Sequence, residues 1–236
     1  MKTTQNLLII FFLNIYTFLA AQTSPNMLLH EVYKKMRKAD DYTVDAKIKS
    51  DIPLIKILPV KAKIYFKQED KIKVESKSIA ILPKQGMSDF SATIKDTTTY
   101  TAIITGKEKI GDVITQVVNI IPNENSKDLI LAKLWIDGDK KLVLQSQLTT
   151  RSSGTMLINY FYKTQEKYGL PDSLVFTVDV KKFKIPKGVA ADINKSKEAP
   201  KVDEEKQKKG RIFIGLSNYQ INQGLKDDIF AKKETK

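Results

Sequence analysis

The stretch Val60-Lys61-Ala62-Lys63-Ile64-Tyr65-Phe66 decides the fold of this chain. Its apolar residues occupy every second position, with lysines between them. Because successive side chains of a β-strand point to opposite faces, this alternation predicts a strand with one dry and one solvated face. Asp45–Lys49 and Lys71–Glu75 repeat the pattern. The three segments together indicate an antiparallel sheet whose lysines lie on the wet side.

Further strand patterns follow along the chain, with turn-forming residues between them. Parallel strands need crossover helices, and the short connections here leave no room for them. We therefore expect a mainly β (α+β) fold in which a curved antiparallel sheet closes into a barrel or a deep half-barrel. The predicted strands are Tyr42–Ser50, Val60–Lys67, Lys71–Ser76, Ser78–Leu82, Thr97–Thr105, Val113–Ile121, Ile130–Asp137, Lys141–Thr149, Thr155–Lys163, Ser173–Lys182 and Arg211–Gln220.

One long helix is predicted, over Pro25–Asp40. Ser24 offers a capping oxygen, and a proline follows it at the first helical position. Apolar residues recur behind it at helical spacing, so one face of this helix is expected to pack on the sheet. The segment Pro83–Phe90 interrupts the strands. It is either a short helical lid, folding Met87 and Phe90 over the mouth of the sheet, or an ordinary surface loop.

The N-terminus has the features of an export signal. Lys2 precedes the apolar run Leu7–Ala20, and small residues follow the run. The run is shorter than the roughly 20 residues of a membrane span, and a buried N-terminal helix is the alternative. We predict that residues 1–21 are a signal peptide and that residues 22–236 form a single domain. No cysteine follows the run, so we expect a soluble periplasmic protein without a lipid anchor.

Charge has two further consequences. The formal net charge is +13. Nucleic acid is not expected as a partner, because no aromatic residues interleave with the lysines. Anionic lipid head groups or an acidic partner remain open, beside the plainer interpretation of lysine as a solvated strand residue. The segment Lys195–Lys209 is strongly charged and nearly free of large apolar residues, which predicts a disordered loop.

Patterns that carry chemistry are missing from the sequence. The chain has no cysteine and one histidine, His30, which is expected on the helix surface. Neither a nucleophile elbow nor a phosphate, dinucleotide or metal motif is present. Asp137-Gly138-Asp139 lacks the further ligands of a calcium loop and is interpreted as a hairpin turn. We expect no enzyme activity, no cofactor and no metal.

Three motifs carry a resemblance to a known family. Leu134–Leu142 reads Leu-Trp-Ile-Asp-Gly-Asp-Lys-Lys-Leu, and it is followed by Phe183–Val189 and the terminal stretch Ile212–Leu225. Together with the signal and the helix, they resemble the LolA/LolB lipoprotein-carrier superfamily, which includes RseB-like sensors. The resemblance implies an unclosed barrel with a helix-lined cavity for acyl chains. It also implies architectural roles for Trp135, which packs the sheet, and Asp137, which orders the turn.

The resemblance and the surplus apolar strand faces favour a non-enzymatic periplasmic carrier of lipoprotein or lipid acyl chains. The alternatives are an RseB-like sensor and a structural envelope adaptor with a filled core. A carrier implies an inner-membrane lipoprotein-releasing transporter, an outer-membrane acceptor and transient contact with the membrane surface, and we expect a monomer. The alternation predicts these cavity-lining residues: Ala62, Ile64, Phe66, Ile72, Val74, Met87 and Phe90.

Overall fold

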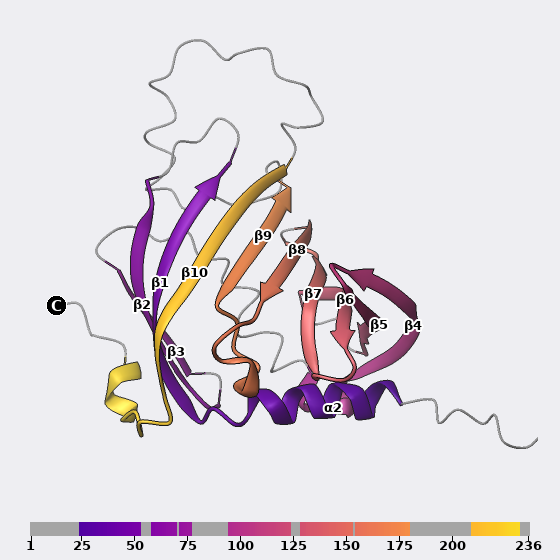
Figure 1. Ribbon diagram of the computed structural model, residues 1–236. Coiled ribbons are helices and arrows are strands. Elements are labelled where there is room, and N and C mark those ends of the chain that lie inside the picture. Colours follow the sequence, from indigo (N-terminus) through magenta and orange to yellow (C-terminus); the bar gives the residue numbers. More distant parts are fainter. Residues whose placement is uncertain are drawn as a thin grey trace, which may run out of the picture.

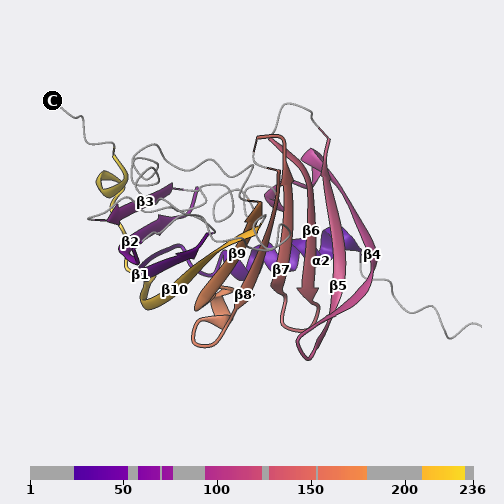
Figure 2. The same cartoon turned by 90° about the horizontal axis from the view of Figure 1, so that it is seen from above.

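The computed structural model describes residues 24–52, 58–69, 71–76, 94–123, 128–152, 154–179 and 209–231. Within them, ten strands form one antiparallel sheet in the order β3-β2-β1-β10-β9-β8-β7-β6-β5-β4. The sheet is strongly curved and stays open between its edge strands β3 and β4 (Figures 1 and 2). The strands are β1 Asp41–Asp51, β2 Val60–Lys67, β3 Lys71–Ser76, β4 Tyr100–Ile110, β5 Val113–Pro122, β6 Leu129–Asp137, β7 Leu142–Thr150, β8 Gly154–Phe161, β9 Ser173–Asp179 and β10 Lys209–Ile221.

This architecture confirms the predicted fold class. Among the strands, β4 differs most from the prediction: Thr97–Thr99 is a 3-10 turn, η2, and the strand runs from Tyr100 to Ile110. The Asp96 carboxylate accepts the backbone N–H of Thr98 and thereby caps this turn, which keeps the segment from joining the sheet. The last strand, β10, lies between β1 and β9, so both ends of the domain meet in the middle of the sheet.

Helix α2 (Pro25–Met36) is the predicted N-terminal helix, and it ends four residues earlier than expected. Pro25 occupies the first turn, and the basic residues Lys34 and Lys35 stand in the last. After Met36 the chain turns, with the backbone N–H groups of Lys38 and Ala39 donating to the carbonyls of Lys35 and Met36, and β1 begins at Asp41. The buried carboxylate of Asp41 accepts the backbone N–H groups of residues 223, 224 and 225, which ties the start of β1 to the end of β10.

The core lies on the inner face of the sheet. Residues directly opposite each other on neighbouring strands share a face, so the pairs Ile64–Val44 and Ile212–Phe176 extend one apolar surface across the sheet. Leu28, Leu29 and Val32 of α2 join the same cluster, which places the helix against this face. Buried members contributed by the strands include Val44, Ile48, Ile64, Val118, Ile120, Leu134, Ile158, Phe176, Ile212 and Ile214.

The outer face of strands β8 to β10 also carries apolar side chains. From the sequence, such two-sided strands are expected to need cover on both sides. The structure instead leaves Phe161 49% exposed. The guanidinium of Arg211 lies over the ring of Phe213, 5.5 Å from its centroid, and shields it in part. Isolated apolar side chains on a surface are tolerated in this way.

Trp135 and Asp137 stand at the end of β6. The indole Nε1 of Trp135 donates a 2.7 Å hydrogen bond to Glu108 Oε2, and the Lys133 ammonium lies 4.5 Å from the centre of a Trp135 ring. The Asp137 carboxylate accepts the backbone N–H groups of Asp139 and Lys140, each at 3.0 Å. The tryptophan thus joins β6 to β4, and the aspartate orders the β6–β7 turn.

We expect protonation of Glu108 to be visible in tryptophan fluorescence. Hydrogen bonds from Trp135 and then from Lys133 lower the pKa of the Glu108 carboxyl. A lowered pKa means that the carboxylate's contribution to stability is present above the unfolded-state pKa and is lost as the pH falls through the folded-state pKa. Trp135 is the chain's one tryptophan. Its emission should therefore change below the ordinary glutamate pKa of about 4.3.

The control for this titration is Glu108→Gln, which keeps an acceptor for the indole but has no carboxyl to titrate. The acidic emission change should disappear in that variant. A transition that persists in Glu108→Gln, or that lies at or above the ordinary glutamate pKa, would contradict the assignment.

Several expectations from the sequence lie outside the described residues. These are the signal peptide at residues 1–21, the strand Ser78–Leu82, the lid residues Met87 and Phe90, and the motif Phe183–Val189. The charged segment Lys195–Lys209 lies outside them too, except that Lys209 opens β10. Among the described residues, no helix combines the length and apolar character needed to cross a membrane.

Candidate functional site

Five of the predicted lining residues fall within the described part of the chain, and all five share the inner face. Ile64 pairs with Val74, and Phe66 pairs with Ile72. Their burial differs sharply: Ile64 is 1% exposed, whereas Ile72 and Val74 on edge strand β3 are 37% and 39% exposed. Ala62 is buried beside Ile64. The centre of the predicted site is therefore packed core, and its outer edge is an accessible apolar surface.

An aromatic contact connects this edge to the interior. The rings of Tyr42 and Phe66 stack with their centroids 4.9 Å apart, and Tyr219 meets Tyr42 edge-on at 5.7 Å. Phe66 lies opposite Ile72 in the register. An apolar path thus runs from the exposed residues of β3, across Phe66, to Tyr42.

Tyr42 in turn lines an apolar cavity beneath helix α2, with a volume of about 80 Å³. Typical ligand pockets enclose about 300–1,000 Å³, so this space holds only a small part of an acyl chain while the helix is in place. No local pattern in the sequence indicates this cavity, because its walls come from five separate segments. They are formed by Val32, Met36, Tyr42, Lys141, Leu142, Val143, Tyr160, Tyr162, Gly169, Leu170, Pro171, Leu174 and Phe176.

Two of the tyrosines that line the cavity, Tyr160 and Tyr162, keep their hydroxyls hydrogen-bonded and uncharged. Tyr160 and Ser146 share a 2.9 Å hydrogen bond, and Tyr162 donates to the Val143 carbonyl at 2.9 Å. Burial raises the pKa of Tyr160 to about 12 and also raises the pKa of Tyr162. Apart from Lys141, the cavity is lined by uncharged aliphatic and aromatic side chains, which suit a hydrocarbon chain.

Lysines surround the same end of the molecule. Lys141 belongs to the wall of the apolar cavity and also to a second, open hollow of about 810 Å³. We call the lysines of this hollow the lysine rim. They come from the end of α2 and the residues after it, from the β6–β7 turn, and from the β8–β9 connection. The rim consists of Lys34, Lys35, Lys38, Lys140, Lys141, Lys163 and Lys167.

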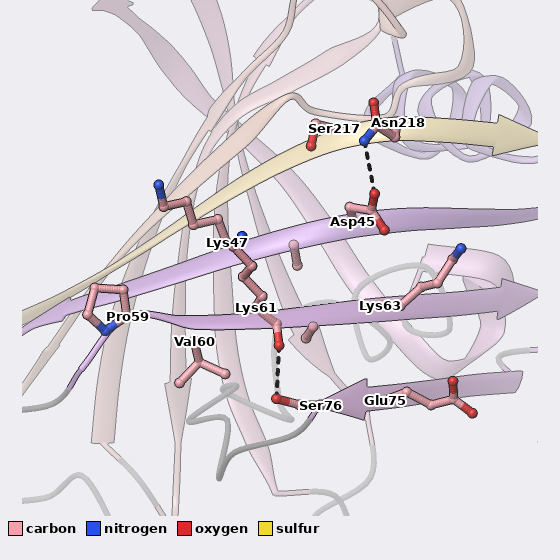
Figure 3. Close-up of a pocket in the computed structure, with 12 residues that line it drawn as sticks. Asp45, Lys47, Pro59, Val60, Lys61, Lys63, Glu75, Ser76, Ser217 and Asn218 are labelled. Atoms are coloured by element: carbon pink, nitrogen blue, oxygen red, sulfur yellow. Dashed lines mark hydrogen bonds between the residues drawn. The ribbon is translucent and has the colours of Figure 1, made fainter.

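A third hollow, of about 930 Å³, crosses strands β10, β1, β2 and β3. Figure 3 shows Lys47, Lys61 and Lys63 projecting away from Val60, so the lysines lie on the outer face. Asp45 lies directly opposite Lys63 and accepts a 2.9 Å hydrogen bond from the Asn218 amide. This hollow is wide and open, and the lysines along it agree with the predicted solvated strand face.

Catalytic and metal-binding arrangements are not found in the part of the chain that the structure describes. It holds no cluster of three or more histidine, cysteine, aspartate or glutamate residues suited to a metal ion. His30 lies exposed on α2. In the β6–β7 turn, the Asp137 carboxylate accepts two backbone N–H groups and is occupied in ordering the turn. The arrangement found here can bind an apolar ligand next to cationic groups.

Comparison with solved structures identifies the fold. A LolA superfamily protein from Nitrosomonas europaea matches with a TM-score of 0.56 at 12% identity, over 86% of this chain and 97% of that one. A DUF1329 family protein from Desulfovibrio piger matches at 0.54 and 12% identity, over 89% and 98%. A putative outer membrane lipoprotein-sorting protein domain from Vibrio parahaemolyticus matches at 0.53 and 9% identity, over 85% and 94%.

The chain therefore has the LolA-like fold, an open antiparallel half-barrel with a helix on its inner face. At the level of sequence, residues 60–165 match the model of the MucB/RseB N-terminal domain. That segment begins with β2 and reaches past β8. No curated protein matches the whole chain in sequence.

Proposed function

We propose that this protein is a non-enzymatic periplasmic module that binds the acyl chains of lipoproteins or lipids and carries them towards the outer membrane. The observation that carries the proposal is the apolar path on the inner face. It begins at Ile72 and Val74, passes Phe66 and Tyr42, and ends in the cavity beneath α2. The LolA-like fold supports the same function.

The two ends of this apolar path differ in accessibility, which suits an acylated ligand. Its outer end is accessible at the edge of the sheet, whereas its inner end is closed by α2. Each methylene transferred from water to such a surface contributes about 0.8 kcal/mol. A whole acyl chain exceeds the volume of the closed cavity, so binding requires α2 to move away from the sheet. We propose α2 as the movable cover of the site.

A regulatory module is the second candidate function. It is favoured by the match of residues 60–165 to the MucB/RseB N-terminal domain, because this segment contributes most of the inner face. Such a module uses the same path to detect an acylated ligand and passes the signal to a protein partner. Capture of a lipoprotein-releasing transporter would favour the carrier, and capture of a signalling protein would favour the regulator.

We expect the protein to bind a fluorescent fatty-acid probe stoichiometrically and to release it when a diacylated peptide is added. The double variant Ile72→Ser/Val74→Ser should remain folded, since both side chains are already partly exposed. Its affinity should fall about 30-fold, because the two truncated side chains together remove roughly 2 kcal/mol of apolar contact. Fluorescence titration measures this change.

The matched control is Ile103→Ser/Ile121→Ser. These isoleucines are 47% and 45% exposed and stand on the outer face of β4 and β5. The control variant removes a similar apolar area and should bind the probe as the parent protein does. Equal losses in both double variants, or no probe binding by the parent protein, would refute an acyl-binding site on the inner face.

A further inference from the structure

The lysine rim lies outside the buried core, and only Lys141 among its members also lines the apolar cavity. It gathers seven lysines and two glutamates around one hollow, which leaves a net of five positive charges. The lysines are far apart in the sequence, between Lys34 and Lys167, and the fold brings them to one end of the molecule. Like charges gathered on one surface create a field that favours an anionic partner.

Contacts within the rim fix some ammonium groups and leave others free. Lys35 Nζ donates a 2.7 Å hydrogen bond to the Lys140 carbonyl, and Lys140 forms a 3.1 Å salt bridge with Glu166. Burial and then repulsion by Lys38 and Lys140 lower the pKa of Lys35, against the opposing effect of Glu166. Among described residues, Lys38 and Lys163 form no salt bridge with a carboxylate.

The position of the lysine rim beside the apolar cavity indicates which class of anion it binds. Lys141 belongs both to the rim and to the wall of the apolar cavity. The helix α2, which closes that cavity, carries Lys34 and Lys35 in its last turn. Positive charge beside an apolar cavity matches the order of layers in a membrane, where anionic head groups cover the acyl chains.

We propose that the lysine rim docks the protein on an anionic lipid bilayer, with the α2 side of the apolar cavity turned towards the head groups. This surface goes beyond acyl binding itself, because attachment to head groups needs no ligand in the cavity. Failure of vesicle binding would leave the acyl site untouched, and failure of acyl binding would leave the rim untouched.

The test is flotation of the protein with vesicles that contain phosphatidylglycerol, beside vesicles of phosphatidylcholine alone. The rim variant is Lys38→Gln/Lys163→Gln/Lys167→Gln, whose side chains lie on the open hollow. Each lysine near an anionic surface strengthens binding roughly fivefold, so the triple variant should bind the anionic vesicles about 100-fold more weakly. Added salt should release the parent protein, because it screens exposed charges.

The control is Lys47→Gln/Lys61→Gln/Lys63→Gln, which removes the same number of positive charges from the third hollow, the one that crosses β10, β1, β2 and β3. This variant should keep most of its affinity for anionic vesicles. If both triple variants lost the same affinity for anionic vesicles, vesicle binding would depend on net charge alone, and the proposal would be overturned. Absence of binding to anionic vesicles, or equal binding to phosphatidylcholine alone, would overturn it as well.

Discussion

Replacement of Ile64 by glutamate is expected to unfold the protein. Ile64 is 1% exposed and packs in the inner-face cluster, opposite Val44 and Val74. A carboxylate at this position would be buried without a partner, which costs about 3–5 kcal/mol or more. Single domains are stable by only about 5–15 kcal/mol. The variant should therefore either be unfolded at ambient temperature, with no cooperative melting transition, or have a melting temperature lowered by more than about 10 °C. Circular dichroism during heating measures the result.

The matched control is Lys61→Glu on the same strand. Lys61 stands on the outer face opposite Lys47 and is exposed, so its replacement should change the free energy of unfolding by less than about 0.5 kcal/mol. A folded Ile64→Glu variant with an ordinary melting transition would show that this part of the inner face is hydrated. The acyl site would then extend to the centre of β2, as the alternation alone predicts.

Much of the fold follows from local patterns. The alternation in Val60–Lys67 and Lys71–Ser76 predicts both strands with the bounds that the structure has, because each pattern ends at a turn. The start of α2 follows from Ser24-Pro25, although Ser24 makes no side-chain capping hydrogen bond. The end of α2 could not be predicted in this way. The residues just after it are held by a group far along the chain, since the side-chain amide of Asn222 donates a hydrogen bond to the Lys38 carbonyl.

The candidate site is less predictable, for a related reason. Alternation identifies the inner face of β2 and β3, but it cannot separate a filled position such as Ile64 from an accessible one such as Val74. That difference depends on which strand lies at the edge of the sheet. The cavity beneath α2 and the lysine rim combine residues from distant segments, and no local spacing signals them. The insertion of β10 between β1 and β9 brings several of these segments together.

The central claim is that acyl chains bind beneath α2 after the helix moves away, and a reversible lock on the helix tests it. Gly169 lies beside the end of α2: a Cβ atom added there would lie 3.4 Å from Met36 Cγ. Met36 Cγ occupies the place that Sγ takes in a cysteine, and in a disulfide bond a Cβ atom lies about 3 Å from the partner's Sγ, so cysteines at positions 36 and 169 are close enough to be linked after a small adjustment. The natural chain has no cysteine, so no other disulfide competes. Gly169 has φ +65°, and a cysteine there costs about 1–2 kcal/mol.

The measurement is acyl-probe affinity of Met36→Cys/Gly169→Cys in its oxidised and reduced forms, with intact mass to establish the state of the thiols. The same molecule serves as its own control, since only the cross-link changes. Met36 and Gly169 both line the cavity, so the oxidised form is compared with the reduced form and not with the parent protein. The account predicts that the reduced form binds the probe. The oxidised form should bind it at least about 100-fold more weakly, because the closed cavity excludes most of the chain's methylenes, each contributing about 0.8 kcal/mol. Equal affinity of the two forms would contradict the account and place the acyl site elsewhere on the sheet.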